Sequence, residues 1–320
     1  MPDLTDSYWS RIFVIVGCPR RDPMVDKTNQ GATDSTKEKG FLADAPVDEH
    51  ERDLYPLDGD AHRIDTLEAV DDDAIRFFHE YGYLAVDSGL SDEEVEGCQQ
   101  GINDLIDGKY EGFRSVMVEA GAREAYPNMD VEERRSVVRK VFNFVDVEPR
   151  LTSLTTHSGI LDVVRRLMGG IEPRMLQDMA LLKPARIGRE KAWHQDMAYF
   201  DVPIETTVVG VWIALDAATL ENGCLHVVPG SHKAGPHPHF KVRDWQICDT
   251  VVRTECSLPV PLLPGGLLFW HGLTHHGSPS NRSDQGRRGI QLHYQPENTV
   301  KTSKDARLAV YGGEGLGMTC

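Results

Sequence analysis

The sequence predicts an α+β protein in which helices pack on a β-sandwich or small barrel. The first observation is the order of the signals, because amphipathic helical segments lie before residue 172 and short β-rich runs follow it. The second is the close spacing of these runs, which Gly, Pro and Asn turn signals separate. We find no internal repeat, so the helical and β-rich parts are expected to form one domain.

The helical part contains four amphipathic segments with recognisable ends. A capping box, Ser91-Asp-Glu-Glu94, opens one of them, and Gly169-Gly170 closes another. Acidic capping residues precede the first, which carries Phe77 and Phe78. We therefore expect helices over residues 71–83, 91–105, 132–142 and 160–168.

The β-rich part contains five short runs bounded by turn residues. Asn222-Gly223 and Pro229-Gly230 are two of these turns, and their residue types favour tight reversals between strands. We expect strands over residues 175–182, 207–215, 225–228, 262–269 and 288–294.

The N-terminal stretch differs from the rest of the chain. From Arg20 to Arg63 it is rich in charged residues, Gly and Pro and has no sustained apolar period, which is typical of a disordered or loosely attached segment. We expect an N-terminal extension over residues 1–63 and one folded domain over residues 64–320. The extension could be an interaction segment, or upstream sequence from a wrong start codon, with Met24 as an alternative start.

Charge and composition exclude several classes of partner. The 320 residues carry a formal net charge of −16, from 50 acidic and 34 basic residues, which disfavours nucleic acid and the anionic face of a membrane. The apolar run over residues 12–17 is too short to span a bilayer. Six scattered cysteines without a CxxC pair indicate reduced thiols. A cytoplasmic protein is therefore expected, whose oligomeric state the sequence does not reveal.

The stretch Trp193-His-Gln-Asp-Met-Ala-Tyr-Phe200 contains a possible metal-binding pair. Side chains at i and i+2 of an extended segment point to the same side, so His194 and Asp196 project together. A third ligand from a distant His would complete a 2-His-1-carboxylate face with open positions, which suits Fe(II) better than structural zinc. The alternative is a surface His beside a solvated Asp.

A second group of residues follows the run Gly265-Gly-Leu-Leu-Phe-Trp-His271. His275 and His276 come next, and Arg287 lies eleven residues past His276, at the start of the final expected strand. A hairpin of this length places the start of one strand beside the end of the other, and a guanidinium there could pair with the far carboxylate of a metal-chelating 2-oxo diacid. Since strand neighbours face opposite sides, Arg288 should point away from Arg287.

Three ordered motifs together resemble the phytanoyl-CoA dioxygenase family. Besides the stretch 193–200, they are Glu221-Asn-Gly-Cys-Leu-His-Val-Val-Pro-Gly-Ser-His232 and His276-Gly-Ser-Pro-Ser-Asn-Arg-Ser-Asp-Gln-Gly-Arg287. The resemblance covers roughly residues 70 to 320 and implies a double-stranded β-helix, the jelly-roll or cupin-like fold, with helices packed on one sheet. It implies His194, Asp196 and His276 as Fe(II) ligands and Arg287 as the 2-oxoglutarate anchor. It also suggests three 2-oxoglutarate neighbours: Trp212, Ser278 and Met179.

The resemblance implies a reaction as well as a fold. An iron- and 2-oxoglutarate-dependent dioxygenase would use O2 to hydroxylate a C–H bond of a small organic substrate, releasing succinate and CO2. Because Asp196 is a carboxylate and not Gly or Ala, hydroxylation is favoured over halogenation, whereas desaturation or cyclisation would need no change of ligands. Two alternatives remain: a cupin-like hydrolase or isomerase without 2-oxoglutarate, which would not need Arg287, and a non-catalytic small-molecule-binding relative.

The substrate itself is not predicted. An acyl-CoA, an amino-acid-like compound and a natural-product intermediate all fit the resemblance. A basic cluster precedes the iron motif and could meet an anionic group such as a CoA phosphate, or could be a solvated loop; it consists of Lys183, Arg186, Arg189 and Lys191.

Overall fold

The computed structural model describes residues 50–313 and residue 320. The expectations for residues 1–49 and for Met24 lie outside this range. Residues 50–62, which the sequence analysis placed in the extension, include side chains that pack against the folded domain. Tyr55 is buried and its ring stacks on Trp193 at 5.2 Å between centroids. Ala61 is also buried, so this stretch belongs to the folded part of the chain.

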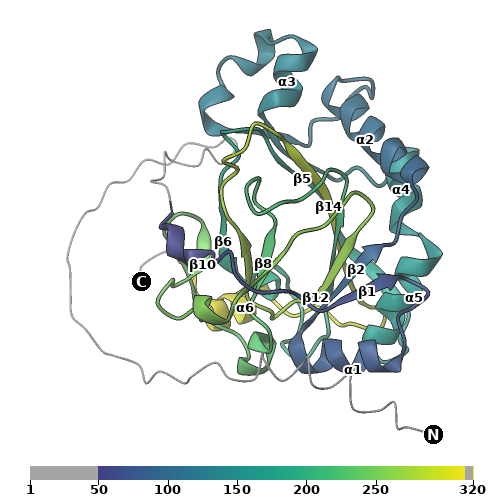
Figure 1. Ribbon diagram of the computed structural model, residues 1–320, viewed down its shortest axis with the longest axis vertical. Coiled ribbons are helices and arrows are strands. Elements are labelled where there is room, and N and C mark those ends of the chain that lie inside the picture. Colours follow the sequence, from purple (N-terminus) through teal and green to yellow (C-terminus); the bar gives the residue numbers. More distant parts are fainter. Residues whose placement is uncertain (1–49, 314–319) are drawn as a thin grey trace, which may run out of the picture. The chain divides into compact units, whose positions relative to one another are not determined.

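Two facing sheets form the core, which is the double-stranded β-helix that the resemblance implies (Figure 1). The larger sheet has eight strands, in the spatial order β1 (Arg63–Thr66), β2 (Tyr83–Ser88), β12 (Leu267–His271), β7 (Val209–Ala214), β14 (Arg287–Pro296), β5 (Pro173–Lys183), β4 (Val138–Phe142) and β3 (Val116–Val118). The smaller sheet has four, in the order β11 (Leu258–Val260), β8 (Leu225–Val227), β13 (His276–Ser278) and β6 (Lys191–His194). A separate hairpin joins β9 (His239–Lys241) to β10 (Trp245–Ile247).

Helices cover the outer face of the larger sheet (Figure 1). The α-helices are α1 (Asp72–Tyr81), α2 (Asp92–Ile106), α3 (Val131–Val137), α4 (Pro149–Thr155), α5 (Ser158–Leu167) and α6 (Lys304–Tyr311). Short 3-10 helices are η2 (Arg52–Leu54), η3 (Ala120–Ala122), η4 (Tyr126–Asn128), η5 (Asp196–Tyr199), η6 (Ser231–Ala234) and η7 (Thr254–Cys256). The predicted capping box of Ser91 and Glu94 is confirmed at the start of α2.

The strand register divides the larger sheet into two faces. Val141, Ala180, Ile290, Ile213 and Leu267 are partners across β4, β5, β14, β7 and β12, and all are fully buried in the core beneath the helices. The next row along the same strands lies on the opposite face, because side chains alternate along a strand. This inner row faces the smaller sheet and consists of Phe142, Met179, Gln291, Trp212 and Leu268.

The expected helix over residues 132–142 is wrong in its second half. Helix α3 ends at Val137, and residues 138–142 form strand β4, which pairs with β5. The run Val137-Val-Arg-Lys-Val-Phe142 is rich in β-branched residues, and Val138 and Val141 are fully buried. Burial against the larger sheet therefore outweighs the helical period read from the sequence.

The expectation of reduced thiols is wrong for three of the described cysteines, Cys248, Cys256 and Cys320, which are disulfide-bonded. Cys248 and Cys320 form a disulfide with their Cα atoms 5.4 Å apart, across 72 residues of sequence. Cys98 and Cys224 are free and buried. Sequence spacing could not reveal the disulfide because the fold alone brings its two ends together. No described helix is long and apolar enough to cross a membrane.

Candidate metal centre

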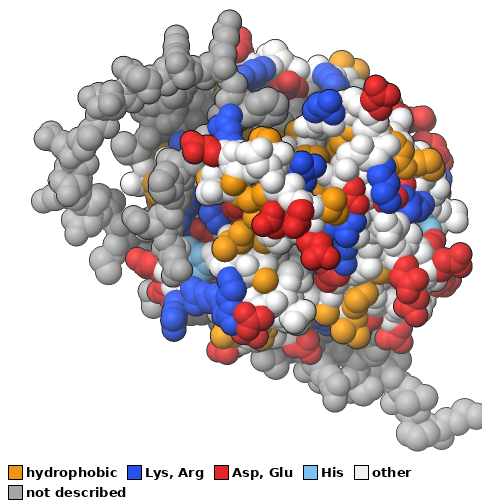
Figure 2. Space-filling view, turned by 90° about the horizontal axis from the view of Figure 1, so that it is seen from above, with side chains coloured by type: hydrophobic (Ala, Val, Ile, Leu, Met, Phe, Trp, Pro, Cys, Tyr) orange, Lys and Arg blue, Asp and Glu red, His pale blue; other side chains and the backbone are white. Residues whose placement is uncertain are grey.

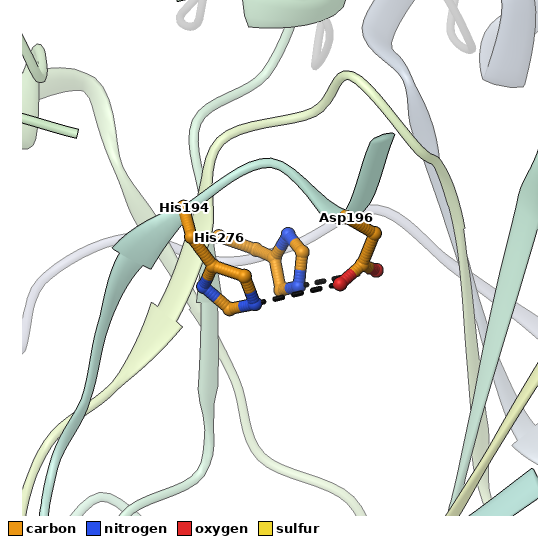
Figure 3. Close-up of side chains that lie close together, drawn as sticks. All are labelled: His194, Asp196 and His276. Carbon is orange, nitrogen blue, oxygen red and sulfur yellow. Dashed lines mark ion pairs between the residues drawn. The ribbon is translucent and has the colours of Figure 1, made fainter. Parts of the chain in front are cut away.

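Three potential metal ligands converge between the two sheets. His194 ends β6, Asp196 begins η5, and His276 begins β13, where it is the direct cross-strand partner of His194. Nε2 of His194 lies 3.4 Å from Oδ1 of Asp196, and Nε2 of His276 lies 3.5 Å from Oδ2. Figure 3 shows the two imidazoles and the carboxylate turned toward one another. One atom from each residue can therefore reach a common metal ion.

Backbone carbonyls fix the orientation of both imidazoles. Nδ1 of His194 lies 2.8 Å from the carbonyl oxygen of Ala192, and Nδ1 of His276 lies 3.0 Å from that of Thr274. A carbonyl oxygen only accepts, so each Nδ1 carries the proton and each Nε2 presents its lone pair. Nε2 of His276 has no hydrogen-bond partner among the described residues, although it is fully buried. A bound metal would satisfy this atom.

The charge states of the group suit a divalent cation. Burial lowers the pKa of His276 to about 3, so this imidazole is neutral at physiological pH. Burial alone would raise the pKa of Asp196, but the surrounding imidazoles, among them His293 with its hydrogen bond to Oδ2, hold it well below its usual value. Two imidazoles and one carboxylate form the ligand set typical of non-haem Fe(II), and no thiolate is part of the cluster.

Contacts outside the ligands hold the turn that carries Asp196. The backbone N–H of Met197 donates to the carbonyl of Gly272 at 3.0 Å. Arg307 on α6 donates to the carbonyl of Ala198 and, at 2.8 Å, to Oδ1 of Asp201. The C-terminal helix therefore helps to position the carboxylate.

Arg287 lies on the inner face of β14 as a buried cation without a counter-ion among the described residues. Its side chain is 3% exposed, and neither Nε nor Nη1 has a hydrogen-bond partner there. Its guanidinium carbon lies 5.0 Å from the centroid of the Trp212 ring, whose Nε1 also lacks a partner. Burial lowers the pKa of Arg287 to about 10, so it stays charged at neutral pH. An anion with several acceptor oxygens would satisfy these donors.

Two glycines make room for indole rings on this inner face. A Cβ atom on Gly289 would lie 2.2 Å from the Trp212 ring, and one on Gly210 would lie 2.4 Å from the Trp270 ring. Both contacts are shorter than any side chain tolerates, so the two rings rest directly on bare backbone. The absence of a side chain at Gly289 thus allows the Trp212 indole to lie against the backbone beside Arg287.

The other residues named by the resemblance lie in the same space. Ser278 is buried on β13, two residues beyond His276, and Met179 is the cross-strand partner of Gln291 on the inner face. Arg288 points the other way, as the alternation predicted, and pairs with Asp216 at 2.7 Å. His275 is buried with its ring 4.8 Å from that of His237, away from the ligand cluster.

The sequence analysis missed Lys140, which reaches the inner face only because β4 is a strand. Its Nζ lies 5.5 Å from the centroid of the Phe142 ring, and no carboxylate pairs with it among the described residues. Burial, followed by the charges of Lys191 and Arg139, lowers its pKa to about 8. The alternation of Val138, Lys140 and Phe142 is the signal that could have revealed it.

The basic cluster before the iron motif does not form a free cationic patch. Nζ of Lys183 donates to three backbone carbonyls, those of Arg189, Ser278 and Pro279. The other three cations pair with carboxylates: Arg186 with Asp284, Arg189 with Glu119 and Lys191 with Asp244. On the face drawn in Figure 2, acidic and basic side chains are likewise intermixed. This loop therefore offers no unpaired site for a phosphate.

A cavity of about 1080 Å³ lies between α2 and α3 and the ends of β5 and β14, and Arg287 is one of its lining residues. It does not include the three ligands. Of its other charged lining residues, Arg288 pairs with Asp216 and Arg135 with Asp107.

The chain is similar to known proteins over most of its length. The chain is 25% identical over 316 residues to the phytanoyl-CoA dioxygenase domain-containing protein 1 homolog of Caenorhabditis elegans, covering 95% of this chain and 94% of that protein. It is 24% identical over 271 residues to a phytanoyl-CoA dioxygenase of Arabidopsis thaliana, covering 73% and 91%. Among solved structures, EvdO2 of Micromonospora carbonacea, complexed with 2-oxoglutarate, shares the fold with a TM-score of 0.59 at 24% identity, covering 73% of this chain and 94% of that one. The family model of phytanoyl-CoA dioxygenase (PhyH) matches residues 78–289, a span that contains the three converging ligands and Arg287, and the chain therefore belongs to this family of iron- and 2-oxoglutarate-dependent oxygenases.

Proposed function

We propose that this protein is an Fe(II)- and 2-oxoglutarate-dependent dioxygenase that hydroxylates a C–H bond of a small organic substrate. One observation carries the proposal: a buried 2-His-1-carboxylate cluster and a buried guanidinium with unmet donors lie in the same space between the sheets. The first is suited to Fe(II), and the second to the distal carboxylate of a 2-oxo diacid.

The roles of the residues follow from their positions. His194, Asp196 and His276 would hold the iron, leaving its other positions open. Arg287 would bind the distal carboxylate of 2-oxoglutarate, with Trp212, Ser278 and Met179 beside it. When bound, the iron and 2-oxoglutarate supply an oxidant from O2, with release of succinate and CO2.

Lys140 extends this set on the same inner face, where the strand register places it in one row with Leu181 and Gly289. It is a partly buried cation without a carboxylate partner, and Phe142 beside it is paired with Met179. We propose that Lys140 contributes a second positive charge to the binding of the doubly negative co-substrate. A buried site excludes water, and this protects an oxidising reaction from side reactions.

The substrate is a small molecule whose identity stays open. The pairing of Arg186, Arg189 and Lys191 with carboxylates counts against recognition of a CoA phosphate by this loop. A cytoplasmic location stays a prediction, and the disulfide between Cys248 and Cys320 counts against it, because such bonds are typical of oxidising compartments.

An anaerobic titration of the metal-free protein with Fe(II) and then 2-oxoglutarate tests the proposal without a known substrate. Chelation of the 2-oxo acid by the iron is expected to give a saturable visible charge-transfer band, which His276→Ala abolishes. Iron binding without this band would favour the cupin-like metalloenzyme that needs no 2-oxoglutarate. Absence of iron binding would favour a non-catalytic relative.

A further inference from the structure

The carboxylate of Asp196 receives both of its strong hydrogen bonds on one oxygen. Nε1 of Trp270 donates to Oδ2 at 2.7 Å, and Nε2 of His293 lies 2.8 Å from the same atom. An indole N–H can only donate, and an ionised carboxylate can only accept, so the His293 nitrogen carries the proton here, and the Gln291 amide nitrogen 3.2 Å from it does not donate to it. Oδ1 receives no such hydrogen bond among the described residues; Nε2 of His194 lies 3.4 Å from Oδ1, and Nε2 of His276 lies 3.5 Å from Oδ2.

Both donors are rigidly placed. Trp270 and His293 are 0% and 1% exposed, so their hydrogen bonds to Asp196 do not compete with solvent. The Trp270 ring rests on the backbone of Gly210, and the His293 ring packs on Phe200 with 4.9 Å between centroids. They come from β12 and β14, whereas Asp196 follows β6 in the other sheet. The donors therefore fix the carboxylate from across the barrel.

We propose that Trp270 and His293 are positioning residues that keep Asp196 a one-oxygen ligand of the iron. Two N–H donors occupy the lone pairs of Oδ2, which leaves Oδ1 as the ligand atom. This inference rests on the proposed function, because it concerns the same metal site.

The number of open coordination positions on the metal depends on whether Asp196 binds through one oxygen or two. An octahedral metal with two imidazoles and one carboxylate oxygen keeps three positions, enough for the two donor atoms of 2-oxoglutarate and one further molecule. A carboxylate that binds through both oxygens would take one of these three. The two hydrogen bonds would therefore favour co-substrate binding without strengthening metal binding itself.

Trp270→Phe provides a mild test, because it removes the N–H and retains an aromatic ring against Gly210. We expect the dissociation constant of 2-oxoglutarate, read from the charge-transfer band, to rise about 2- to 10-fold, the range for one lost hydrogen bond. Fe(II) affinity, measured anaerobically by chelator competition, should be unchanged or tighter. His293→Leu should act in the same direction, and His293→Gln, which keeps an N–H donor, should restore part of the 2-oxoglutarate affinity.

Trp193→Phe is the matched control. Trp193 is also fully buried and donates one indole hydrogen bond, at 3.0 Å to the carbonyl of Leu54, but its ring stacks on Tyr55, away from the ligand cluster. Loss of this hydrogen bond in Trp193→Phe should change neither the 2-oxoglutarate affinity nor the Fe(II) affinity.

Three results would overturn the inference. In one, Trp270→Phe leaves 2-oxoglutarate affinity unchanged. In another, it weakens iron and 2-oxoglutarate binding equally, as a general loss of structure would. In the third, Trp193→Phe has the same effect as Trp270→Phe. A wild-type protein without any charge-transfer band would instead overturn the proposed function.

Discussion

Arg287 and Arg288 are neighbours on β14, yet their side chains lie in opposite environments. The Arg288 side chain is 27% exposed and donates to Asp216 at 2.7 and 2.8 Å, whereas Arg287 is 3% exposed and faces Trp212 with two unmet donors. The strand alternation alone separates a structural ion pair from a potential ligand anchor.

The two arginines give a matched pair of variants. Arg287→Ala should raise the dissociation constant of 2-oxoglutarate about 10- to 100-fold, because a charge-assisted pair is lost, with little change in Fe(II) affinity. Arg288→Ala should leave 2-oxoglutarate affinity unchanged. Titration of the charge-transfer band measures both, and a stronger effect of Arg288→Ala would show that the anchor has been assigned to the wrong face.

The adjacent histidines allow a similar comparison at the metal. His276→Ala should abolish stoichiometric Fe(II) binding, since it removes one of three ligands. His275→Ala should retain iron, because the His275 ring packs on His237 and is not in the cluster. Metal content of the two variants after anaerobic loading and desalting distinguishes these outcomes, and iron loss in His275→Ala alone would reverse the assignment.

Gly289 is predicted to be intolerant of even one methyl group. A Cβ would lie 2.2 Å from the Trp212 ring, so Gly289→Ala must displace the indole and should cost about 1–3 kcal/mol of unfolding free energy. Gly286→Ala is the control, because its nearest neighbour would be an ordinary 3.7 Å contact to the Lys183 carbonyl. Denaturant melts of both variants test this; equal stabilities would mean that the ring has room to move.

Lys140 should make the stability of the ligand-free protein depend on pH. Its folded pKa of about 8 is below the ordinary value of 10.5, so between these pH values the unfolded chain binds more protons and stability rises with pH. Below about pH 8 Lys140 is charged in the folded state as well, so the full cost of burying this charge lowers the stability. Above about pH 10.5 Lys140 is uncharged in both the folded and the unfolded state. Lys140→Met should therefore be more stable than wild type at pH 7, by on the order of 1–2 kcal/mol after allowance for partial exposure, and not at pH 11. Melts at both pH values measure the difference; an advantage that persists at pH 11 would reflect better packing instead of charge.

The disulfide should contribute strongly to stability. It closes a loop across 72 residues, for which the chain-entropy model gives about 4 kcal/mol. Cys248→Ser should lower the melting temperature under non-reducing conditions, and Cys320→Ser should lower it to the same value. Thiol counting on the denatured protein is the control, since reactive thiols at both positions would mean that the bond does not form.

Local patterns predicted parts of the candidate site, whereas the choice of His276 over His275 rested on the family resemblance. His194 and Asp196 are two residues apart, and their common direction follows from extended backbone; the alternation on β14 separated Arg287 from Arg288. Lys140 was missed because a six-residue run of Val, Phe and basic residues is compatible with both a helix and a strand, and tertiary burial decided between them. Trp270 and His293 could not be predicted as partners of Asp196, because their convergence depends on the registers of β12 with β7 and of β7 with β14.

The unmet hydrogen-bond donors of Arg287 make the stability of the folded protein depend on its ligand. A buried guanidinium without partners destabilises the empty protein, and a ligand that binds only the folded state stabilises it, by about 2.7 kcal/mol at a hundred times its dissociation constant. If 2-oxoglutarate is that ligand, starvation for this acid would expose more of the protein to proteases. The half-life of the protein in a cell would then follow the supply of a metabolite, independently of whether its substrate is present.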